Sequence, residues 1–488
     1  MTMQMEQPLS FRILYLVILF IVCMRIIYDT RNTTKTLAYL LFALFVPYAG
    51  ILFYFIFGIN YRKRKIYNRK LLDNDALGAR LKRDVYRYTK QTFNENDAVV
   101  QNNRELAYML LNDSRSPLTA HNAVEILVNG EKKFPEVIKA LQGAKNHIHI
   151  EYYIYDDDET GRLIEQILVQ KAREGVKVRF IYDDFGSRSI RKKMHRRMLD
   201  AGIEIFPFYK IFFIPFANRI NYRNHRKIIV VDGQTAFIGG INVSDRYVND
   251  GKPGKLYWRD THMRIDGPGV QYLQYLFLAD WHFCSDLEVP LDETLFPPYR
   301  TYTLRDDKIV QIVASGPDSE TPSILFSVLK AINLARQEIL ITTPYFIPGE
   351  SLTNALITAS LSGISVKILV PGISDSIFVN AAARSYYTEL LDAGVEIYRY
   401  RKGFLHSKTM VTDREISIVG TANMDLRSFD LNFEVNAVVY NKDIAEKLKD
   451  IFYSDLKDAE KIDPERWANR PVLVEMLEKT ARLLSPLL

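Results

Sequence analysis

Residues 224–242 read NHRKIIVVDGQTAFIGGIN and carry a histidine, a lysine two positions later and an aspartate five positions after the lysine. The same spacing recurs at residues 405–423, LHSKTMVTDREISIVGTAN. One such pattern is a weak signal, but its duplication indicates two related units in one chain. The equivalent positions are His225, Lys227, Asp232 and Asn242 in the first copy and His406, Lys408, Asp413 and Asn423 in the second.

In both copies an apolar run separates the lysine from the aspartate, and a second apolar run follows the aspartate. This pattern predicts a short buried strand, a turn at the aspartate and a second strand. Side chains two residues apart share one face of a strand. Each motif therefore presents an imidazole beside an ammonium group.

Other segments recur as well. GVKVRFIY at residues 175–182 matches GISVKILV at 363–370, and LDAGIEIF at 199–206 matches LDAGVEIY at 391–398. Because strand-like segments alternate with helical ones, we expect an α/β fold in which two repeats pack as a pseudo-two-fold dimer. The expected repeats are residues 121–310 and 311–488.

The amino-terminal region is apolar. Residues 37–59 are 23 uncharged residues, and as a helix they would span about 34 Å against a hydrocarbon core of about 30 Å. The run at 13–24 reaches a spanning length if residues 25–28 are included. No small-residue cleavage site separates the two, so residues 1–60 are predicted to form a retained transmembrane hairpin rather than a signal peptide.

A basic run, YRKRKIYNRK, follows at residues 61–70 and opens a predicted helical connector over 61–120. By the positive-inside rule it places the catalytic part on the cytoplasmic side of the inner or plasma membrane. It would also attract anionic lipid.

The formal net charge is +6, but residues 61–90 alone hold 11 Lys or Arg against 3 Asp. The remainder is about neutral, which argues against a nucleic-acid surface. The two cysteines are far apart, and neither a metal-binding cluster nor a glycine-rich nucleotide loop is present in the sequence. We therefore expect no metal and no cofactor.

Two His-Lys pairs facing each other would suit a phosphodiester. The lysines would neutralise its oxygens as charge builds, and Asn242 and Asn423 would add neutral phosphate-binding donors. One neutral histidine would attack phosphorus to give a phosphohistidine, while the other would protonate the departing alcohol and later deprotonate an incoming one.

Each histidine then needs an acceptor for its other ring nitrogen. Two acidic residues that open apolar strands are candidates: Asp260, 35 residues past His225, and Glu434, 28 residues past His406. Asp232 and Asp413 are predicted to lie at strand ends, where they would fix the turn rather than touch substrate.

The first half has 11 extra residues before its motif, within FPFYKIFFIPF at residues 206–216. This run is either a buried loop under the site or an exposed apolar lip that touches acyl chains. The adjacent membrane segment favours the lip.

The duplicated motif resembles that of the phospholipase D superfamily. Together with NRINYRNHRK (218–227), YWRDTHMRIDGPGV (257–270) and GTANMDLRSFDLNFE (420–434), the chain resembles bacterial cardiolipin synthases. The resemblance implies condensation of two phosphatidylglycerols into cardiolipin and glycerol without metal or nucleotide. It also implies His225 as nucleophile, His406 as acid/base, and an active site of His225, Lys227, Asp232, His406, Lys408 and Asp413.

Three alternatives stay open. A membrane-bound phospholipase D could use the same residues with water as acceptor and release phosphatidic acid. A nuclease of the same superfamily is disfavoured by charge and by the membrane segment, and a non-catalytic scaffold is disfavoured by two intact motifs. Phosphatidylethanolamine could replace one of the two lipids.

Overall fold

The computed structural model describes residues 9–30, 33–46, 48–55, 86–208, 222–285, 287–298, 306–483 and 485. The basic run at 61–70 and most of the aromatic insertion at 206–216 lie outside the described residues. At the start of that insertion, the Phe206 ring lies 5.2 Å from that of Trp281 and the Phe208 ring 4.9 Å from that of Phe433. This first part of the insertion is therefore packed inside the main body of the protein.

The amino-terminal unit contains α1 (Leu9–Asp29), α2 (Thr33–Phe45) and α3 (Ala49–Phe53). Helix α1 has 21 residues and is the one helix in the described part of the chain that is long and apolar enough to cross a membrane. A small cluster of Val22, Ile26, Ala43 and Tyr54 packs these helices together.

The expected continuous helix over residues 37–59 is wrong, because the structure divides this segment between α2 and α3. In the sequence Pro47 lies between the two helices, and proline has no N–H to continue the hydrogen-bond ladder. Tyr48 then adopts a positive φ of 60°. A side chain on Gly50 would lie 2.2 Å from the Phe42 carbonyl oxygen, so α3 turns back onto α2.

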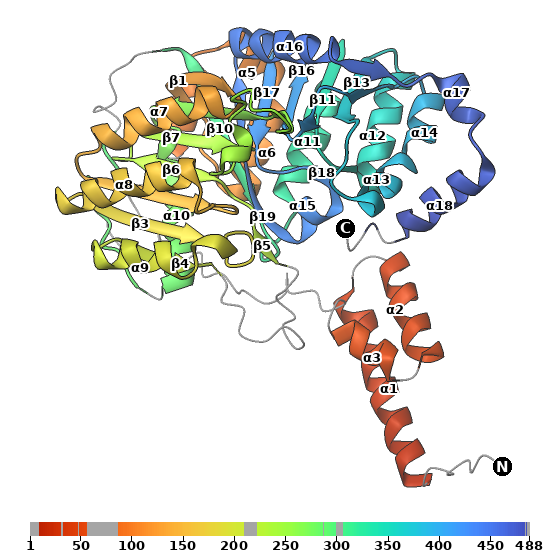
Figure 1. The fold of residues 1–488 in the computed structure, drawn as a ribbon. Helices are drawn as coiled ribbons and strands as arrows, with labels where there is room; N and C mark the ends of the chain where they lie inside the picture. The colour runs from red at the N-terminus through yellow and green to blue at the C-terminus, as the bar shows by residue number, and fades with distance from the viewer. Residues whose placement is uncertain are drawn as a thin grey trace. The chain divides into compact units, whose positions relative to one another are not determined.

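The main body is built on a 16-stranded sheet of two related halves, in which 15 strands follow one continuous order and the short strand at residues 223–224 pairs beside them (Figure 1). From the centre outwards the first half runs β1 (Thr119–Val128), β9 (Thr261–Asp266), β7 (Thr235–Gly239), β6 (Ile228–Val231), β2 (His147–Tyr152), β3 (Lys177–Tyr182) and β4 (Glu204–Pro207). The second half runs β10 (Lys308–Ser315), β19 (Asn432–Tyr440), β17 (Ile416–Gly420), β16 (Thr409–Thr412), β11 (Glu338–Thr342), β13 (Ser365–Pro371) and β14 (Glu396–Tyr400), with β20 (Ala459–Lys461) at the edge.

The halves join where β1 and β10 pair antiparallel, with Thr119 opposite Val310. Corresponding strand pairs have the same sense: β2 and β3 are parallel, as are β11 and β13, while β6 and β7 are antiparallel, as are β16 and β17. The predicted α/β fold of two related repeats is confirmed.

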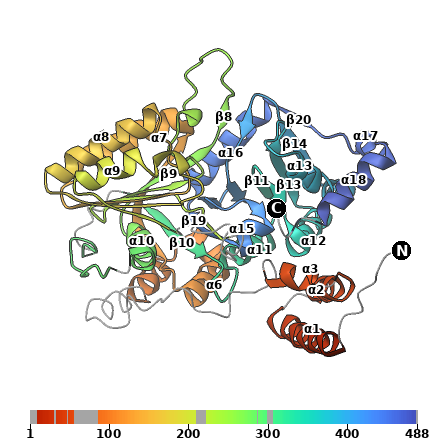
Figure 2. The same cartoon turned by 60° about the horizontal axis from the view of Figure 1, so that its bottom comes forward.

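Helices cover both faces of each half. Figure 2 shows α7 (Asn129–Gly143), α8 (Glu159–Arg173) and α9 (Lys193–Asp200) on one face of the first-repeat strands and α10 (Val270–Ser285) on the other. In the second half, α11 (Ser323–Leu334), α12 (Gly349–Leu361), α13 (Ile377–Arg384) and α14 (Tyr387–Asp392) pack on the strands, as does α16 (Lys442–Leu456). Separate apolar cores lie under these layers and hold the strands that carry the motifs.

The predicted strand, turn and strand form at both motifs. In the first, Gln234 N donates to Val231 O at 3.0 Å, and the two central turn residues, Asp232 and Gly233, have φ of 52° and 62°. In the second, Asp413 and Arg414 have φ of 53° and 58°. Two successive positive φ values give the turn type whose twist matches that of an antiparallel hairpin. The four residues of β6 are all buried.

Candidate active site

Each motif histidine is attached through its backbone to a strand of the other repeat. The short strand β5 (Arg223–Asn224) pairs in parallel with the start of β19, and His225 N donates to Phe433 O at 3.0 Å. In the other half, β15 (Phe404–Leu405) pairs in parallel with β8 (Trp258–Arg259), and His406 N donates to Arg259 O at 2.8 Å. The two repeats therefore complete each other's motif.

The side chains follow the same exchange. His225 Nδ1 lies 2.9 and 3.0 Å from the two carboxylate oxygens of Glu434, and His406 Nδ1 lies 2.7 Å from Oδ2 of Asp260. Both carboxylates are fully buried. A carboxylate on Nδ1 favours the tautomer with its proton there, which leaves Nε2 with a lone pair for chemistry.

The two lysines lie directly beside these histidines. Lys227 Nζ donates to His225 O at 2.8 Å, and Lys408 Nζ donates to His406 O. Each ammonium thus uses one N–H on its own motif, and within the described ranges no hydrogen bond engages its other two N–H groups. Both side chains are buried.

Burial and mutual repulsion shift all four groups toward their neutral forms. Burial lowers the pKa of His225 to about 4, with Lys227 and Lys408 acting in the same direction against Glu434. Burial and Lys408 lower the pKa of His406 to about 3. Burial lowers the pKa of Lys227 to about 7 and that of Lys408 to about 8. Because charges from each motif act on the other, the two motifs form one site that favours an incoming anion.

The motif aspartates accept hydrogen bonds from backbone N–H groups and do not contact the histidines in the described residues. The Asp232 carboxylate accepts from the backbone N–H groups of residues 145, 146 and 147 at 2.7–2.9 Å. The Asp413 carboxylate accepts from those of residues 336, 337 and 338 at 2.7–3.0 Å. Each thus ties the motif hairpin to the start of the neighbouring strand, β2 or β11. These contacts favour a turn-fixing role, and a part in the reaction stays a prediction.

The two asparagines are buried and already engaged. Asn242 Oδ1 accepts from Ile154 N at 3.2 Å, and its Nδ2 donates to Tyr247 Oη at 2.7 Å. Asn423 Nδ2 donates to Asp425 Oδ2 at 3.0 Å. An amide has a second N–H, so phosphate binding by either side chain stays a prediction.

Sequence reasoning missed several residues that hold the Glu434 carboxylate. Thr421 Oγ1 donates to Oε2 at 2.5 Å, and Asn432 Nδ2 donates to Oε1 at 3.1 Å. Burial raises the pKa of Glu434, but His225 and Lys227 outweigh it and leave the pKa below its ordinary value. Thr421 lies in the GTAN segment, between the second motif and Asn423. This position was the one sequence signal that could have indicated its role beside the motif.

Two buried ion pairs on the covering helices stand behind the carboxylate strands. Arg226 pairs with Asp280 on α10, and its Nε donates to the Glu434 carbonyl oxygen at 3.4 Å. Arg259 Nε donates to Asp455 on α16 at 2.8 Å, and its Nη1 donates to the Asp260 carbonyl oxygen at 2.7 Å. Each histidine-bound residue is thus held at its backbone by an arginine anchored to a helix.

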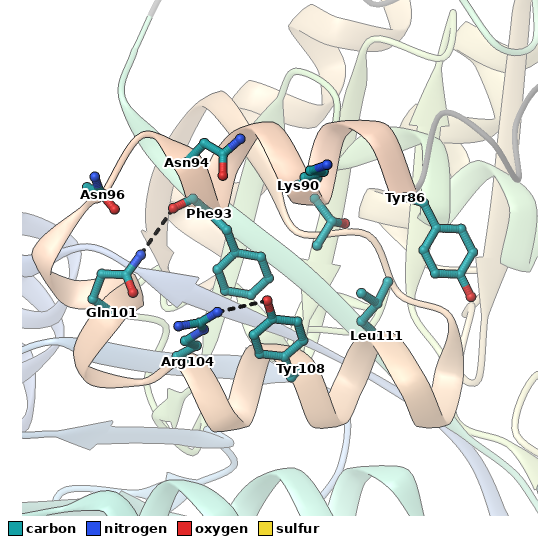
Figure 3. A pocket seen from close by; sticks show the side chains of 10 residues that line it. Tyr86, Lys90, Phe93, Asn94, Asn96, Gln101, Arg104, Tyr108 and Leu111 are labelled. Atoms are coloured by element: carbon teal, nitrogen blue, oxygen red, sulfur yellow. Dashed lines mark hydrogen bonds between the residues drawn. The ribbon is translucent and has the colours of Figure 1, made fainter.

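In the described ranges, no group of three or more His, Cys, Asp or Glu residues is placed to hold a metal ion. Figure 3 shows a surface pocket of ≈ 470 Å³ between the helix at residues 86–94 and α6 (Arg104–Ser114). Its lining includes Lys90, Phe93, Arg104 and Tyr108 but no motif residue. This pocket is therefore separate from the two motifs.

A duplicated α/β sheet with two crosswise His-Lys sites defines a phospholipase D-like protein. A family model described as "Cardiolipin synthase, PLD-like domain" matches residues 137–258 and 328–456, and one described as "Phospholipase_D-nuclease N-terminal" matches residues 13–58. The chain is 40% identical to the major cardiolipin synthase ClsA of Bacillus subtilis, over 94% of this chain and 95% of that protein. It is 39% identical to a cardiolipin synthase of Listeria monocytogenes, over 98% of both.

Among solved structures, the phosphatidylserine synthase of Haemophilus influenzae has a TM-score of 0.59 at 14% identity, covering 79% of this chain and 100% of that chain, which shows a shared fold. The chain belongs to the bacterial cardiolipin synthase family of the phospholipase D superfamily, whose members are phosphatidyltransferases.

Proposed function

We propose that this enzyme transfers a phosphatidyl group from one phosphatidylglycerol to a second, giving cardiolipin and glycerol. The observation that carries the proposal is the crosswise pairing of two neutral histidines with two buried carboxylates beside two lysines. The cardiolipin synthases that match the chain over nearly its full length support the lipid product.

In the first step, Nε2 of His225 attacks phosphorus of the donor lipid. The P–N bond forms as the P–O bond to glycerol breaks, and His406 donates a proton to the departing oxygen. Lys227 and Lys408 bind the non-bridging oxygens, whose negative charge increases in the transition state. Burial of Glu434 and Asp260 keeps both rings fixed during the reaction.

Without substrate both imidazoles are neutral near pH 7, since their pKa values are about 4 and 3. A phosphodiester brings a negative charge into the site, and a nearby opposite charge raises the pKa of a histidine. Substrate binding thus favours the proton that His406 must donate, so the division between nucleophile and acid arises in the complex.

In the second step, His406 accepts a proton from a hydroxyl of the second phosphatidylglycerol. That oxygen attacks phosphorus, a P–O bond forms, the P–N bond breaks and His225 is released. One phosphodiester replaces another, so the reaction needs no nucleotide to drive it. We also propose that it needs no metal, and turnover that is unchanged in EDTA is the expected result.

The test is to supply purified enzyme with phosphatidylglycerol and measure the products. Cardiolipin and glycerol in equal amounts are expected from the wild type and absent from His225→Ala. Phosphatidic acid as the main product would instead support the alternative, a hydrolytic phospholipase D. Adding phosphatidylethanolamine in the same assay shows whether it replaces one of the two lipids.

We further propose that the enzyme is anchored by its apolar amino-terminal segment in the cell membrane with its catalytic body in the cytoplasm. The apolar α1 helix and the basic composition of residues 61–70 support this. Both α1 and the segment of α2 and α3 are proposed to enter the bilayer. Labelling of single introduced cysteines at residue 30 and residue 90 in intact cells tests it: a residue-90 thiol accessible from outside would contradict the proposed orientation.

A further inference from the structure

A loop that follows β3 lies directly beside the first motif. The Asp183 carboxylate accepts from Phe185 N at 3.0 Å and Gly186 N at 2.8 Å within this loop, and from Asn224 N at 3.2 Å on β5. One buried carboxylate therefore fixes the loop to the strand that leads into His225. Both of its oxygens accept hydrogen bonds from backbone N–H groups.

Two guanidinium groups share one aromatic ring of this loop. Arg188 Cζ lies 4.0 Å from the centroid of the Phe185 ring, and Arg223 Cζ lies 4.5 Å from it. Neither arginine forms an ion pair with a carboxylate within 4 Å in the part of the chain that the structure describes. Phe185 and Arg188 are exposed, while Arg223 is buried beneath them. The loop thus presents the Arg188 guanidinium at the surface, while the charge of the buried Arg223 is partly balanced by the Asp183 carboxylate.

This loop lies close to the first motif. Arg223 precedes His225 by two residues, which places both side chains on one face of an extended chain. The Tyr153 ring lies 4.9 Å from the His225 ring and 5.5 Å from Lys227 Nζ. Burial raises the pKa of Tyr153, against the lowering effect of Arg223 and Arg427. The cation cluster therefore borders the first histidine.

A third guanidinium comes from the second repeat. Arg427 lies on α15 (Leu426–Asp430). Burial lowers the pKa of Arg223; Asp183 and Tyr153 oppose this shift, while the charges of Arg427 and Arg188 act with it. Arg223 on β5 is opposite Asn432 at the start of β19, which directly follows α15. Three arginines from three segments therefore lie in one region: Arg188 from the loop, Arg223 from β5 and Arg427 from α15.

The equivalent positions of the other half do not form such a cluster. Phe404 precedes His406 by two residues, as Arg223 precedes His225, so this position is uncharged in the second half. Arg246 follows Asn242 by four residues, as Arg427 follows Asn423; it pairs with Asp156 at 3.1 Å and lies 5.7 Å from the Trp258 ring. Since the fold is duplicated, the cluster is a feature of one side of the site and is not required by the fold.

The proposed reaction supplies a reason for such a feature. It handles two phosphates, and the lysines of the motifs serve the one that reacts. The second lipid carries its own phosphodiester, three carbons away from the terminal hydroxyl that attacks. Guanidinium groups bind phosphate oxygens with paired, charge-assisted hydrogen bonds. Resting on the proposed function, we propose that Arg188, Arg223 and Arg427 bind the phosphate of the second phosphatidylglycerol and so select a phospholipid as acceptor.

The test compares a phospholipid acceptor with a neutral one. Full-length enzyme in mixed micelles of phosphatidylglycerol is supplied with ethanol, and cardiolipin and phosphatidylethanol are measured together. Arg188→Gln and Arg427→Gln are expected to lower the ratio of cardiolipin to phosphatidylethanol about tenfold each and to leave phosphatidylethanol formation unchanged. Arg188→Lys, which keeps a charge, should recover part of the ratio.

Arg246→Gln is the matched control at the equivalent paired position and should keep the wild-type ratio. Melting temperatures identify variants that misfold. If Arg427→Gln misfolds, Arg188→Gln still tests the proposal, because Arg188 is exposed and its replacement should not disturb the fold. An unchanged ratio in folded variants, or an equal fall of both products, would overturn the inference while cardiolipin synthesis by the wild type stands. A wild type that makes phosphatidylethanol but no cardiolipin would overturn the proposed function itself.

Inorganic phosphate forms a second arm, because a free anion has the same chemistry as a headgroup phosphate. Phosphate that inhibits cardiolipin formation and spares phosphatidylethanol formation supports an acceptor site. Equal inhibition of both products, lost in Arg188→Gln, would show that the cluster serves the donor or a free anion and would overturn the acceptor assignment.

Discussion

His225 and His406 occupy equivalent places in two halves of one sheet, but their surroundings differ. Around His406, the rings of Tyr247, Trp258 and Phe404 lie 5.6–5.9 Å from the imidazole. Around His225 the Tyr153 ring lies at 4.9 Å, and beyond it lies a cluster of arginines. The contacts that make the catalytic pairs follow from strand pairing and are duplicated. The outer contacts are free to differ, and there one repeat can be adapted to a second lipid.

The largest expected effect comes from removing either histidine. His225→Ala loses the proposed nucleophile and His406→Ala the proposed acid and base, so each should lower kcat by about 10³-fold or more. The two variants should also differ in the covalent intermediate. His406→Ala keeps the histidine that would carry the phosphatidyl group, and His225→Ala does not. Quenched-flow assays with labelled phosphatidylglycerol measure both. Near wild-type turnover in either variant would remove that histidine from the mechanism.

The crosswise carboxylates rank next. Glu434→Gln and Asp260→Asn keep side-chain shape but replace the anion that stabilises an imidazolium, and comparable changes cost about 10²–10⁴-fold in kcat. Because Glu434 holds His225 and Asp260 holds His406, Glu434→Gln should act mainly on phosphoenzyme formation, whereas Asp260→Asn should slow both proton transfers by His406, including the one in the transfer to an alcohol. Single-turnover kinetics separates the steps. Identical profiles for the two variants would contradict the exchange of partners.

Because the pKa of Lys227 is lowered, we expect anion binding to depend on pH. Lys227, with a pKa of about 7, is about half protonated at pH 7 in the free enzyme. A phosphodiester favours the cation and raises this pKa, so Lys227 should take up about half a proton when dimethyl phosphate binds at pH 7, in addition to any uptake by His406, and binding should weaken above pH 8. Calorimetry in two buffers of different protonation enthalpy measures the uptake. Lys227→Met should lower the uptake by about half a proton, and an unchanged uptake would assign it to other groups.

The smallest predicted effect belongs to the motif aspartates. Asp232→Ala and Asp413→Ala each leave three backbone N–H groups without their acceptor, which should cost about 1–3 kcal/mol of stability. Equal losses are expected because the contacts are equivalent in the two halves. Chemical denaturation measures the loss, with kcat of the folded fraction assayed alongside. A large fall in kcat without a fall in stability would place either aspartate in the chemistry.

Much of the fold followed from local pattern. The strand, turn and strand around each motif are set by apolar runs and by Asp-Gly or Asp-Arg turns, and the structure forms them as expected. Repeated segments such as 175–182 and 363–370 predicted equivalent strands, and they form β3 and β13. Duplication in sequence was sufficient here because each repeat buries the same pattern of residues.

The exchange of partners was not visible in the sequence. Glu434 is 209 residues from His225, and only the parallel pairing of β5 with β19 places them together. Counting residues from each histidine identified Asp260 and Glu434 as the carboxylates, but it did not show that each binds the histidine of the other repeat. The arginine cluster likewise depends on Asp183, which ties a loop to a strand 41 residues away. The break between α2 and α3 was the one clear error, since hydropathy alone gave too little weight to Pro47.

The most direct test of the account is to trap the phosphoenzyme from labelled phosphatidylglycerol and locate the modified residue by mass spectrometry. The account predicts a phosphatidyl group on His225 of the wild type, its persistence in Asp260→Asn and its absence in His225→Ala. Label on His406, or rapid cardiolipin formation with no covalent intermediate at all, would contradict it.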